Sequence, residues 1–259
     1  MPDRSTMKTL MMYERLVPLD REQHRTLRIH QGANRLGFAR DTNSMLLAAS
    51  ELPLAALDYP CVFVQADAGH TLVSIVGLRD KENLMIEADG SWAEQHYVPA
   101  FVRRYPFVLA EQPGQDQMTV CLDEAFDGLD QIQGEALFDA QGEATPYLQQ
   151  LQQFLLSYHQ DMLATGRFAQ HLADLGLLVE RSIDCQINGE RLTLNGFKVV
   201  DEAKLRALPP DTVQSLFASG ALGWVHAHLL SLNNVNKLGA RLGHKLLAAA
   251  SVPPSSTTH

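Results

Sequence analysis

Cysteine is scarce in this sequence, and its scarcity argues against two ways of stabilising a fold. The chain has 259 residues and 3 cysteines, Cys61, Cys121 and Cys185. An odd number of widely separated cysteines without a Cys-x-x-Cys pair indicates neither a disulfide framework nor a cysteine zinc site. Each of the three lies in an apolar run, so we expect buried free thiols.

Long apolar runs are missing as well. Residues 1–12 begin with basic charge, but the apolar run before Tyr13 is only about three residues long, too short for a secretory signal. No run approaches the roughly 18 residues that a membrane-spanning helix needs. We therefore expect no membrane span and a cytoplasmic location, with which reduced cysteines agree.

Basic residues are outnumbered by acidic ones. The chain has 21 Lys and Arg against 30 Asp and Glu, which gives a formal net charge of -9. The long-range field of such a chain disfavours nucleic acid and anionic membrane surfaces, although a basic partner or a local basic patch stays open. Hydrophobic residues make up 46% and charged residues 20%. These values are typical of a soluble globular protein, and we expect one compact domain overall.

Familiar catalytic and cofactor motifs do not occur. The sequence contains no Gly-x-Ser-x-Gly elbow, Walker loop, dinucleotide fingerprint or His-Glu-x-x-His pattern. We therefore expect no cofactor and no metal, although dispersed residues could still form a catalytic site.

Residues 11–145 predict a strand-rich region. Short runs of apolar and β-branched residues alternate with turn residues, which is the pattern of antiparallel strands. These runs cover residues 27–30, 61–64, 71–76, 84–87, 107–109, 118–122 and 136–138. Turns are expected at residues 67–69 and 112–115.

Two short helices are expected, each in front of a pair of strands. Ser50 is the expected N-cap of the first helix, and Pro53 and Pro99 lie in a first turn, where a missing amide hydrogen costs little. Each helix must end before a Tyr-Pro pair, at residues 59–60 or 105–106, because proline disfavours helical geometry in the preceding residue.

The same order of features occurs twice. A proline-led helix, a Tyr-Pro pair, a strand, a turn and a strand appear in residues 53–98 and again in 99–145. The sequence Glu-Ala-Asp-Gly at 87–90 is matched by Asp-Ala-Gln-Gly at 139–142. We interpret this pattern as two copies of a helix-plus-three-strand unit, against the alternative that turn residues recur by chance.

Residues 146–247 predict a helical region with one hairpin. Apolar residues recur at spacings of three and four from residue 148 to residue 172, which is typical of one long amphipathic helix that Gly166 could interrupt. Asn188-Gly189 between two apolar runs predicts a hairpin over residues 183–194.

Further helices and a tail complete this region. Asp201 is an expected N-cap, and Gly220 is an expected helix stop. The helices are expected at residues 201–207, 211–219 and 222–242, and residues 248–259 are expected to be a disordered tail. The fold class is therefore α+β, with a strand-rich N-terminal region followed by a helix-rich C-terminal region.

Residues 97–107, Tyr-Val-Pro-Ala-Phe-Val-Arg-Arg-Tyr-Pro-Phe, contain the candidate ligand-binding residues Arg103, Arg104 and Tyr105. A guanidinium presents a planar fork of donors, so the two arginines could bind a carboxylate or a phosphate. Alternatively, one arginine pairs with a buried acid and the other is solvated. The first copy has Leu57 and Asp58 at these positions, so the arginine pair belongs to one copy only.

Three more polar residues, Arg40, Asn43 and Glu87, complete the candidate binding site. Arg40 and Asn43 lie between apolar segments, where such residues usually form caps and turns. Alternatively, they line a cleft between the two copies together with Glu87 and Arg103.

Two groups resemble metal ligands but lack the necessary spacing. Counted from Asp123, the third and twelfth positions of an EF-hand loop would be Ala125 and Gly134, where oxygen ligands are required. We therefore expect a solvated acidic loop. His226 and His228 lie two residues apart on an expected helix, so they point to different faces and cannot share a metal.

The chain resembles the bacterial SapC family over residues 11–238. The specific part is residues 97–107, and weaker matches lie at residues 13–18, 38–43, 59–60, 122–124, 137–148 and 196–201. The family is named for a surface-layer association, and its members are similar to proteins that accompany outer-membrane uptake receptors, flavin-dependent halogenase-like proteins and cupin-like hydroxylase proteins. The resemblance supplies no catalytic residues.

Three hypotheses about function follow. The first is a SapC-like accessory protein that binds a protein partner or an anionic small ligand, linked to an outer-membrane uptake or halogenase-type system. The second is an enzyme, or a subunit of one, acting on a peptide or aromatic substrate with Glu87, Asp123 or Asp139 as acid or base. The third is a structural surface-layer component. The sequence predicts neither the partner nor the oligomeric state.

Overall fold

The structure of the protein is a computed structural model that describes residues 12–30, 32, 35–66, 69–111, 118–187 and 189–250. The expected turn at residues 112–115 lies outside the described residues. So do most of the turn at 67–69, Asn188 of the hairpin and most of the tail.

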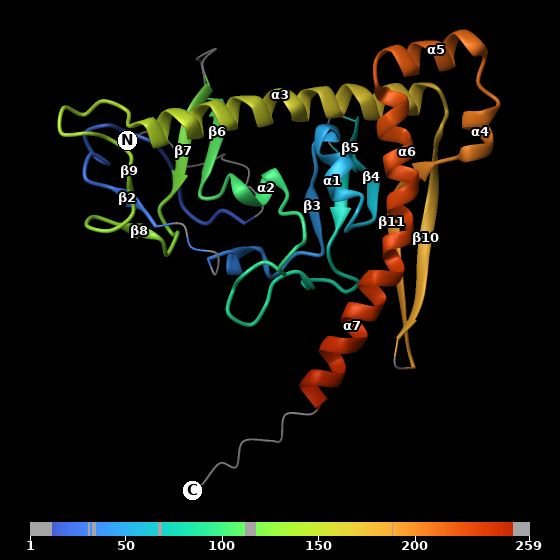
Figure 1. Cartoon of the computed structure of the whole chain (residues 1–259), viewed down its shortest axis with the longest axis horizontal. Helices are drawn as coiled ribbons and strands as arrows, with labels where there is room; N and C mark the ends of the chain where they lie inside the picture. The colour runs from blue at the N-terminus through green and yellow to red at the C-terminus, as the bar shows by residue number, and fades with distance from the viewer. Residues whose placement is uncertain are drawn as a thin grey trace, which may run out of the picture. The chain divides into compact units, whose positions relative to one another are not determined.

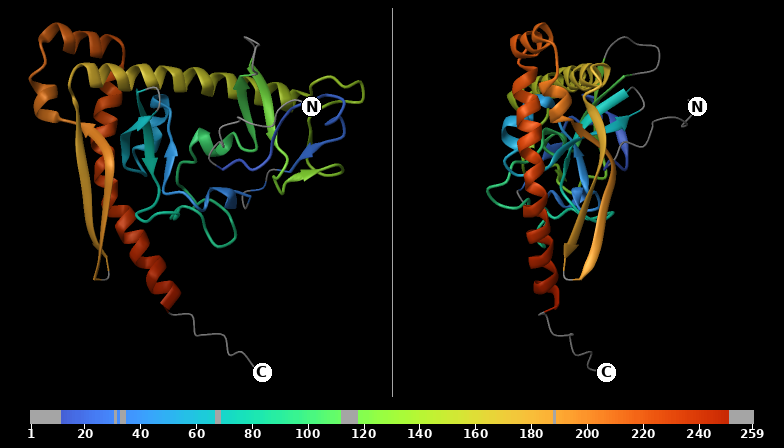
Figure 2. Two further views of the ribbon diagram at one scale, coloured as in Figure 1. Left: turned by 180° about the vertical axis from the view of Figure 1, so that it is seen from behind. Right: turned by 90° about the vertical axis from the view of Figure 1, so that its right-hand side faces the viewer.

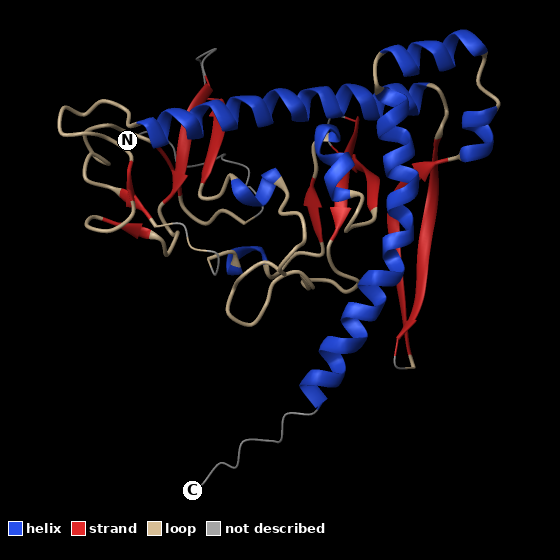
Figure 3. Ribbon diagram, in the orientation of Figure 1, coloured by secondary structure: helices blue, strands red, loops and turns tan. Residues whose placement is uncertain are grey.

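The predicted α+β class is confirmed, because helices and antiparallel sheets occur in the same chain (Figure 3). Contacts divide the chain into two compact units. Unit 1 comprises Met1–Ala39, Ile86–Trp92 and Ala100–Asp161, and unit 2 comprises Arg40–Met85, Ala93–Pro99 and Met162–His259. The units interleave along the chain, so they coincide only in part with the regions 11–145 and 146–247.

Unit 1 contains two small antiparallel sheets. The first has the order β1 (Leu16–Pro18), β7 (Met118–Asp123) and β6 (Phe107–Glu111). The second has the order β8 (Leu129–Asp130), β2 (Arg28–Ile29) and β9 (Glu135–Ala136). The short helix α2 (Ala100–Arg103) precedes β6, as expected, and η1 (Gly37–Ala39) is a single 3₁₀ turn.

Unit 2 contains one five-stranded antiparallel sheet. Its order is β10 (Leu178–Ile187), β11 (Glu190–Val200), β4 (Cys61–Ala66), β5 (Gly69–Ile75) and β3 (Ser44–Leu46). The hairpin of β10 and β11 is longer than the expected 183–194, and it forms a ribbon beside two C-terminal helices (Figures 1 and 2).

A short helix also precedes β4. The 3₁₀ turn η2 (Ala49–Glu51) leads into α1 (Leu52–Ala55), which has Pro53 in its first turn as expected. Ser50 is not the N-cap. The cap residue is Ala48, whose backbone N–H donates to Glu51 Oε2 at 2.9 Å, which is the contact that the glutamate of a capping box makes.

The two strand pairs have the same topology. In each, a preceding strand pairs with the second strand of the hairpin, which gives the orders β3-β5-β4 and β1-β7-β6. The expected third strands are reduced to single bridges, Ile86 with Trp92 and Phe138 with Ala144. The predicted duplication stays a prediction, because equal topology does not by itself establish two copies.

The helices follow the expected periodicity with one difference. α3 (Pro146–Asp174) continues through Gly166 without a break, and Asp201 caps α4 (Glu202–Arg206) by accepting from the N–H groups of Ala203 and Lys204. α5 (Pro210–Ala218) ends before Gly220, which has a φ of 78°. The expected helix at 222–242 is instead α6 (Ala221–Ser231), a 3₁₀ turn η3 (Leu232–Asn234) and α7 (Val235–Ala250).

No helix among the described residues is long and apolar enough to cross a bilayer.

His228 of α6 links three elements in the core of unit 2. Its Nδ1–H donates to the carbonyl of Cys61 in β4 at 2.6 Å, and its Nε2 accepts from the N–H of Val200 in β11 at 3.0 Å. Burial lowers the pKa of His228 to about 4. A neutral, fully hydrogen-bonded imidazole is a core residue, not a metal ligand.

This geometry predicts how acid destabilises unit 2. Because the unfolded imidazole takes up a proton near pH 6.5 and the folded one only near pH 4, the stabilisation is complete above pH 6.5 and is lost as the pH falls to 4. The loss should amount to about 3 kcal/mol. Urea unfolding at pH 7.5 and 4.5 would measure it, and His228→Gln should show a correspondingly smaller pH dependence.

The matched control is His226→Gln, two residues away with an exposed side chain. It should keep the pH dependence of the wild type. Equal pH dependence in wild type and His228→Gln would contradict the assignment.

Candidate functional site

Tyr97, the first residue of the stretch 97–107, is fixed to η2 and to the turn after α1 in unit 2. Its backbone N–H donates to Asp58 Oδ2 at 2.7 Å, and its hydroxyl donates to Glu51 Oε1 at 2.8 Å. The Tyr97 carbonyl accepts from the hydroxyl of Tyr59. The first residue of the stretch is therefore a structural anchor that uses all of its polar groups.

Tyr105, near the end of the same stretch, is an anchor in unit 1. Its ring stacks on Phe38 with centroids 3.9 Å apart and contacts Tyr13 and Phe126 at 5.3 Å and 5.4 Å. Its hydroxyl donates to Asp123 Oδ2 at 3.2 Å. Burial, followed by the charge of Asp123, raises the pKa of Tyr105, so the phenol stays protonated as a donor.

Asp123 is buried in the core of unit 1, so the expectation of a solvated acidic loop is wrong for this residue. Its Oδ1 accepts from the backbone N–H groups of Arg15 and Ala125 at 2.9 Å and 3.0 Å. Its Oδ2 accepts from the N–H of Glu14 at 2.8 Å and from Tyr105. The carboxylate replaces water with four protein donors, which is how a buried charge is tolerated.

The two arginines have different surroundings, although they are adjacent. Arg104 is partly buried, and its guanidinium carbon lies 4.5 Å from the ring centroid of Phe101, 5.2 Å from Tyr158 and 5.7 Å from Tyr13. Its Nε is buried and has no hydrogen-bond partner among the described residues. Arg104 is thus packed as a cation among aromatic faces.

Arg103 is exposed at the C-terminal end of α2. Its guanidinium carbon lies 5.3 Å from the ring centroid of Phe154 on α3. An arginine held over an aromatic ring is pre-organised to contact a planar anion. The structure therefore does not present Arg103 and Arg104 as one fork.

The other predicted site residues lie in both units. Arg40 is exposed and Asn43 is partly buried, both in unit 2, whereas the partly buried Glu87 belongs to unit 1. The backbone carbonyl of Arg40 accepts from Asn83 N–H, and that of Asn43 accepts from Val76 and Gly77 N–H groups. The binding role of Arg103, Arg104, Tyr105, Arg40, Asn43 and Glu87 stays a prediction.

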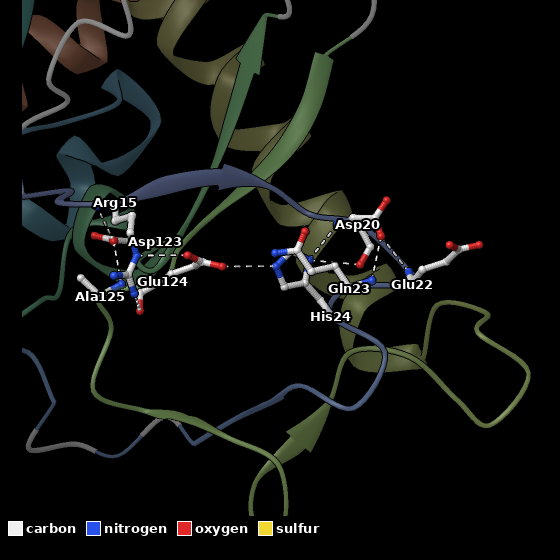
Figure 4. Close-up of polar contacts among 8 residues, drawn as sticks. All are labelled: Arg15, Asp20, Glu22, Gln23, His24, Asp123, Glu124 and Ala125. Atoms are coloured by element: carbon white, nitrogen blue, oxygen red, sulfur yellow. Dashed lines mark hydrogen bonds and ion pairs between the residues drawn. The ribbon is translucent and has the colours of Figure 1, made fainter. Parts of the chain in front are cut away.

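Sequence reasoning missed a cluster of charged residues beside Asp123 (Figure 4). Glu124 accepts from Arg15 Nε at 3.0 Å and faces His24 Nε2 at 3.8 Å. The local signal was the turn begun by Asp20, which accepts from Glu22 and Gln23 N–H groups. Glu124, which faces His24, lies 100 residues further along the chain, and a repeating sequence pattern cannot predict contact between residues so far apart.

Among the described residues, no three His, Cys, Asp or Glu side chains are placed to hold a metal ion. Asp139, one of the candidate catalytic acids, is exposed and accepts from Gln141 and Glu143 N–H groups in a turn.

Two open hollows border the β10–β11 ribbon in unit 2. One of about 550 Å³ lies beside Gly196 and Lys198, and one of about 580 Å³ lies between β10 and α7. Neither is lined by a predicted site residue. At the second hollow, Ile187 packs over Gly239 and Gly243 of α7.

Three exposed leucines lie on adjoining helical segments of unit 2. Leu54 on α1, Leu57 after α1 and Leu230 on α6 are 55%, 65% and 69% exposed. α1 packs against α6. Asn234, four residues after Leu230, donates to the carbonyl of Ala56 at 2.8 Å, so the segments that carry the three leucines are in contact. We call these three residues the leucine patch.

Comparison with known protein families identified a family for this chain. The model of the SapC family matches residues 19–238. No curated protein and no solved structure matches the chain.

The buried carboxylate gives a prediction about stability. Asp123→Ala should cost about 3 kcal/mol or more, because it leaves three backbone N–H groups and a phenol without their acceptor. Asp127→Ala is the matched control, since that side chain is 74% exposed and pairs only at the surface with Arg35, so it should cost less than about 1 kcal/mol. Urea unfolding would measure both, and equal costs would refute the anchor role.

The two arginines give a second prediction. Arg104→Ala should cost about 2 kcal/mol, because it removes a partly desolvated cation from three aromatic faces. Arg103→Ala should cost less than about 1 kcal/mol, because Arg103 is an exposed residue and contacts at the surface contribute little. The free energy of unfolding in urea separates the two variants. A larger loss for Arg103→Ala than for Arg104→Ala would contradict this assignment.

Proposed function

This chain belongs to the SapC family, and we propose that it is an accessory protein that binds a protein partner through the leucine patch of unit 2. The observation that supports this proposal is that Leu54, Leu57 and Leu230 are exposed, although the segments that carry them are otherwise well packed. Burying three such side chains against a partner would remove apolar surface from water, which is the main driving force of association.

The backbone beneath the patch is held firmly. Asn234 donates to the carbonyls of Ala56 and Tyr59 at 2.8 Å and 3.2 Å, and Lys237 Nζ donates to the carbonyl of Leu57 at 2.8 Å. Preformed surfaces bind with a smaller entropic cost than mobile ones. Lys237 also places a cation beside Leu57, where it would face an acidic group at the edge of a partner.

The polar groups proposed for catalysis favour a binding role over chemistry. Asp123 has both oxygens saturated by protein donors, and Asp139 holds its own turn. A carboxylate committed to several backbone N–H groups is a poor general base, because those bonds stabilise its ionised form. We therefore rank the enzyme hypothesis below partner binding, and we rank the surface-layer hypothesis lowest.

Arg103 supports the second candidate, which is binding of an anionic small ligand. Its guanidinium is exposed at the end of α2 and lies over the Phe154 ring. This arrangement suits a carboxylate or a phosphate. Arg104 and Tyr105 would act behind it as packing residues, and the contribution of Arg40, Asn43 and Glu87 stays open.

The test is co-purification of the tagged full chain from its own cells, with mass spectrometry of proteins and small molecules. Leu57→Glu and Leu230→Glu should each reduce the recovered partner at least about tenfold, because a charge would be buried in the interface. Phe217→Glu on α5 is the matched control, since Phe217 is 75% exposed in the same unit and lies outside the patch. It should leave recovery unchanged.

Arg103→Ala separates the two candidates. Loss of a small molecule in Arg103→Ala, with no effect of the leucine variants on any protein, would replace partner binding by ligand binding. Recovery of the same proteins by all variants would reject the leucine patch. Far-UV circular dichroism of each variant confirms that the fold is kept.

A further inference from the structure

His24 is a buried histidine whose ring has one satisfied nitrogen. Its side chain is 6% exposed. Nδ1 lies 2.9 Å from the backbone nitrogen of Asp20 and 3.1 Å from the backbone oxygen of Asp20. In the neutral ring Nδ1 accepts from that N–H, so the ring proton is on Nε2.

Nε2 is buried without a hydrogen-bond partner and faces a carboxylate (Figure 4). The distance from Nε2 to Glu124 Oε1 is 3.8 Å, which is too long for a hydrogen bond but within the range of an ion pair. The neutral ring therefore gains little from Glu124, whereas an imidazolium would be attracted to it across a largely desolvated gap.

Protonation would also change the second nitrogen. An imidazolium carries a proton on Nδ1, which can no longer accept from Asp20 N–H. The carbonyl of Asp20, 3.1 Å away, is placed to accept that proton instead. In the neutral ring Nδ1 accepts from Asp20 N–H, and in the protonated ring Nδ1 donates to the Asp20 carbonyl. Protonation therefore leaves Asp20 N–H without its acceptor.

The contact joins two segments that are far apart in sequence. His24 belongs to the turn that follows β1, and Glu124 directly follows β7. β1 pairs with β7, and Glu124 N–H donates to the carbonyl of Arg15 at 3.0 Å. Attraction between His24 and Glu124 would extend this attachment beyond the end of the β1–β7 pairing.

We propose that His24 and Glu124 form a proton-operated latch, in which protonation of the His24 ring tightens the attachment of residues 13–27 to β7. Histidine is the side chain that most often changes its charge under physiological conditions. A protonated His24 and an ionised Glu124 carry opposite charges, so they attract each other. The latch is independent of the leucine patch, which lies in unit 2.

Other charged groups face this pair. Arg15 contacts Glu124 through Nε at 3.0 Å and donates from its second guanidinium nitrogen to the Glu124 carbonyl at 2.9 Å. It is cationic at every relevant pH, so its contribution is constant. Asp20 uses Oδ1 on Glu22 and Gln23 N–H groups and interacts with His24 and Arg21 through their charges. Among these groups only His24 is a histidine.

The test is thermal unfolding of the full chain at pH 8.0 and pH 5.5. Glu124→Gln should lower Tm by about 2 to 4 °C more at pH 5.5 than at pH 8.0, the shift expected from loss of one partly buried ion pair. In a His24→Asn background the effect of Glu124→Gln should be the same at both pH values. Asparagine keeps an acceptor near Nδ1 and removes the titrating nitrogen.

Glu202→Gln is the matched control, because Glu202 forms an exposed ion pair with Arg206 that involves no histidine. Its effect on Tm should not depend on pH. Comparing variants at each pH also cancels the separate acid sensitivity of His228. An effect of Glu124→Gln that is equal at both pH values, or that still grows with acid in the His24→Asn background, would overturn the latch.

A second measurement applies if His24→Asn does not fold. The amide proton of Asp20 should move upfield in the NMR spectrum between pH 8.0 and 5.5, because it loses its acceptor when Nδ1 is protonated. In Glu124→Gln this movement should be smaller over the same pH interval than in the wild type, because the imidazolium has lost its carboxylate partner. An Asp20 amide that does not move, or that moves identically in both proteins, would reject the proposal.

Discussion

The buried carboxylate of Asp123 is the interaction on which the structure of unit 1 depends. It receives donors from residues 14, 15, 105 and 125, so it joins the N-terminal segment, the turn after β7 and the stretch 97–107. A charge at this depth is tolerable only if every partner is in place, which makes the arrangement all-or-none. The aromatic rings around Tyr105 exclude water and so strengthen each of these bonds.

The stretch 97–107 supplies structural anchors to both units. Tyr97 commits three polar groups to unit 2, and Tyr105 commits its ring and hydroxyl to unit 1. Arg104 lies between these two tyrosines in the sequence, and its guanidinium packs against the rings of Phe101 and Tyr158. The aromatic residues of the stretch therefore serve folding, whereas Arg103 is an exposed residue.

Sequence patterns predicted the structural features that depend on residues close together in the chain. The hairpins of β4 with β5 and β6 with β7, the helix α3 and the caps at Asp201 and Gly220 follow from periodicity and turn chemistry. The strands β1 and β3 are three residues each and exist because distant strands pair with them, so no local pattern indicated them. Asp123 looked like a loop residue because two of its four donors, the N–H groups of Glu14 and Arg15, come from more than 100 residues away. Arg104 directly follows α2 and lies three residues after Phe101, a spacing that could have indicated contact between the two side chains.

His228 has a consequence for how related sequences are compared. Its Nδ1 donates to β4 and its Nε2 accepts from β11, so the two nitrogens of one imidazole join the two strands. Asparagine and glutamine carry donor and acceptor on a single carbon and cannot span that gap. Selection for a folded chain alone would therefore preserve this histidine. If SapC-family sequences have an invariant histidine at this position, its invariance would reflect a requirement of folding. A search that ranks candidate catalytic residues by invariance would then select this histidine wrongly.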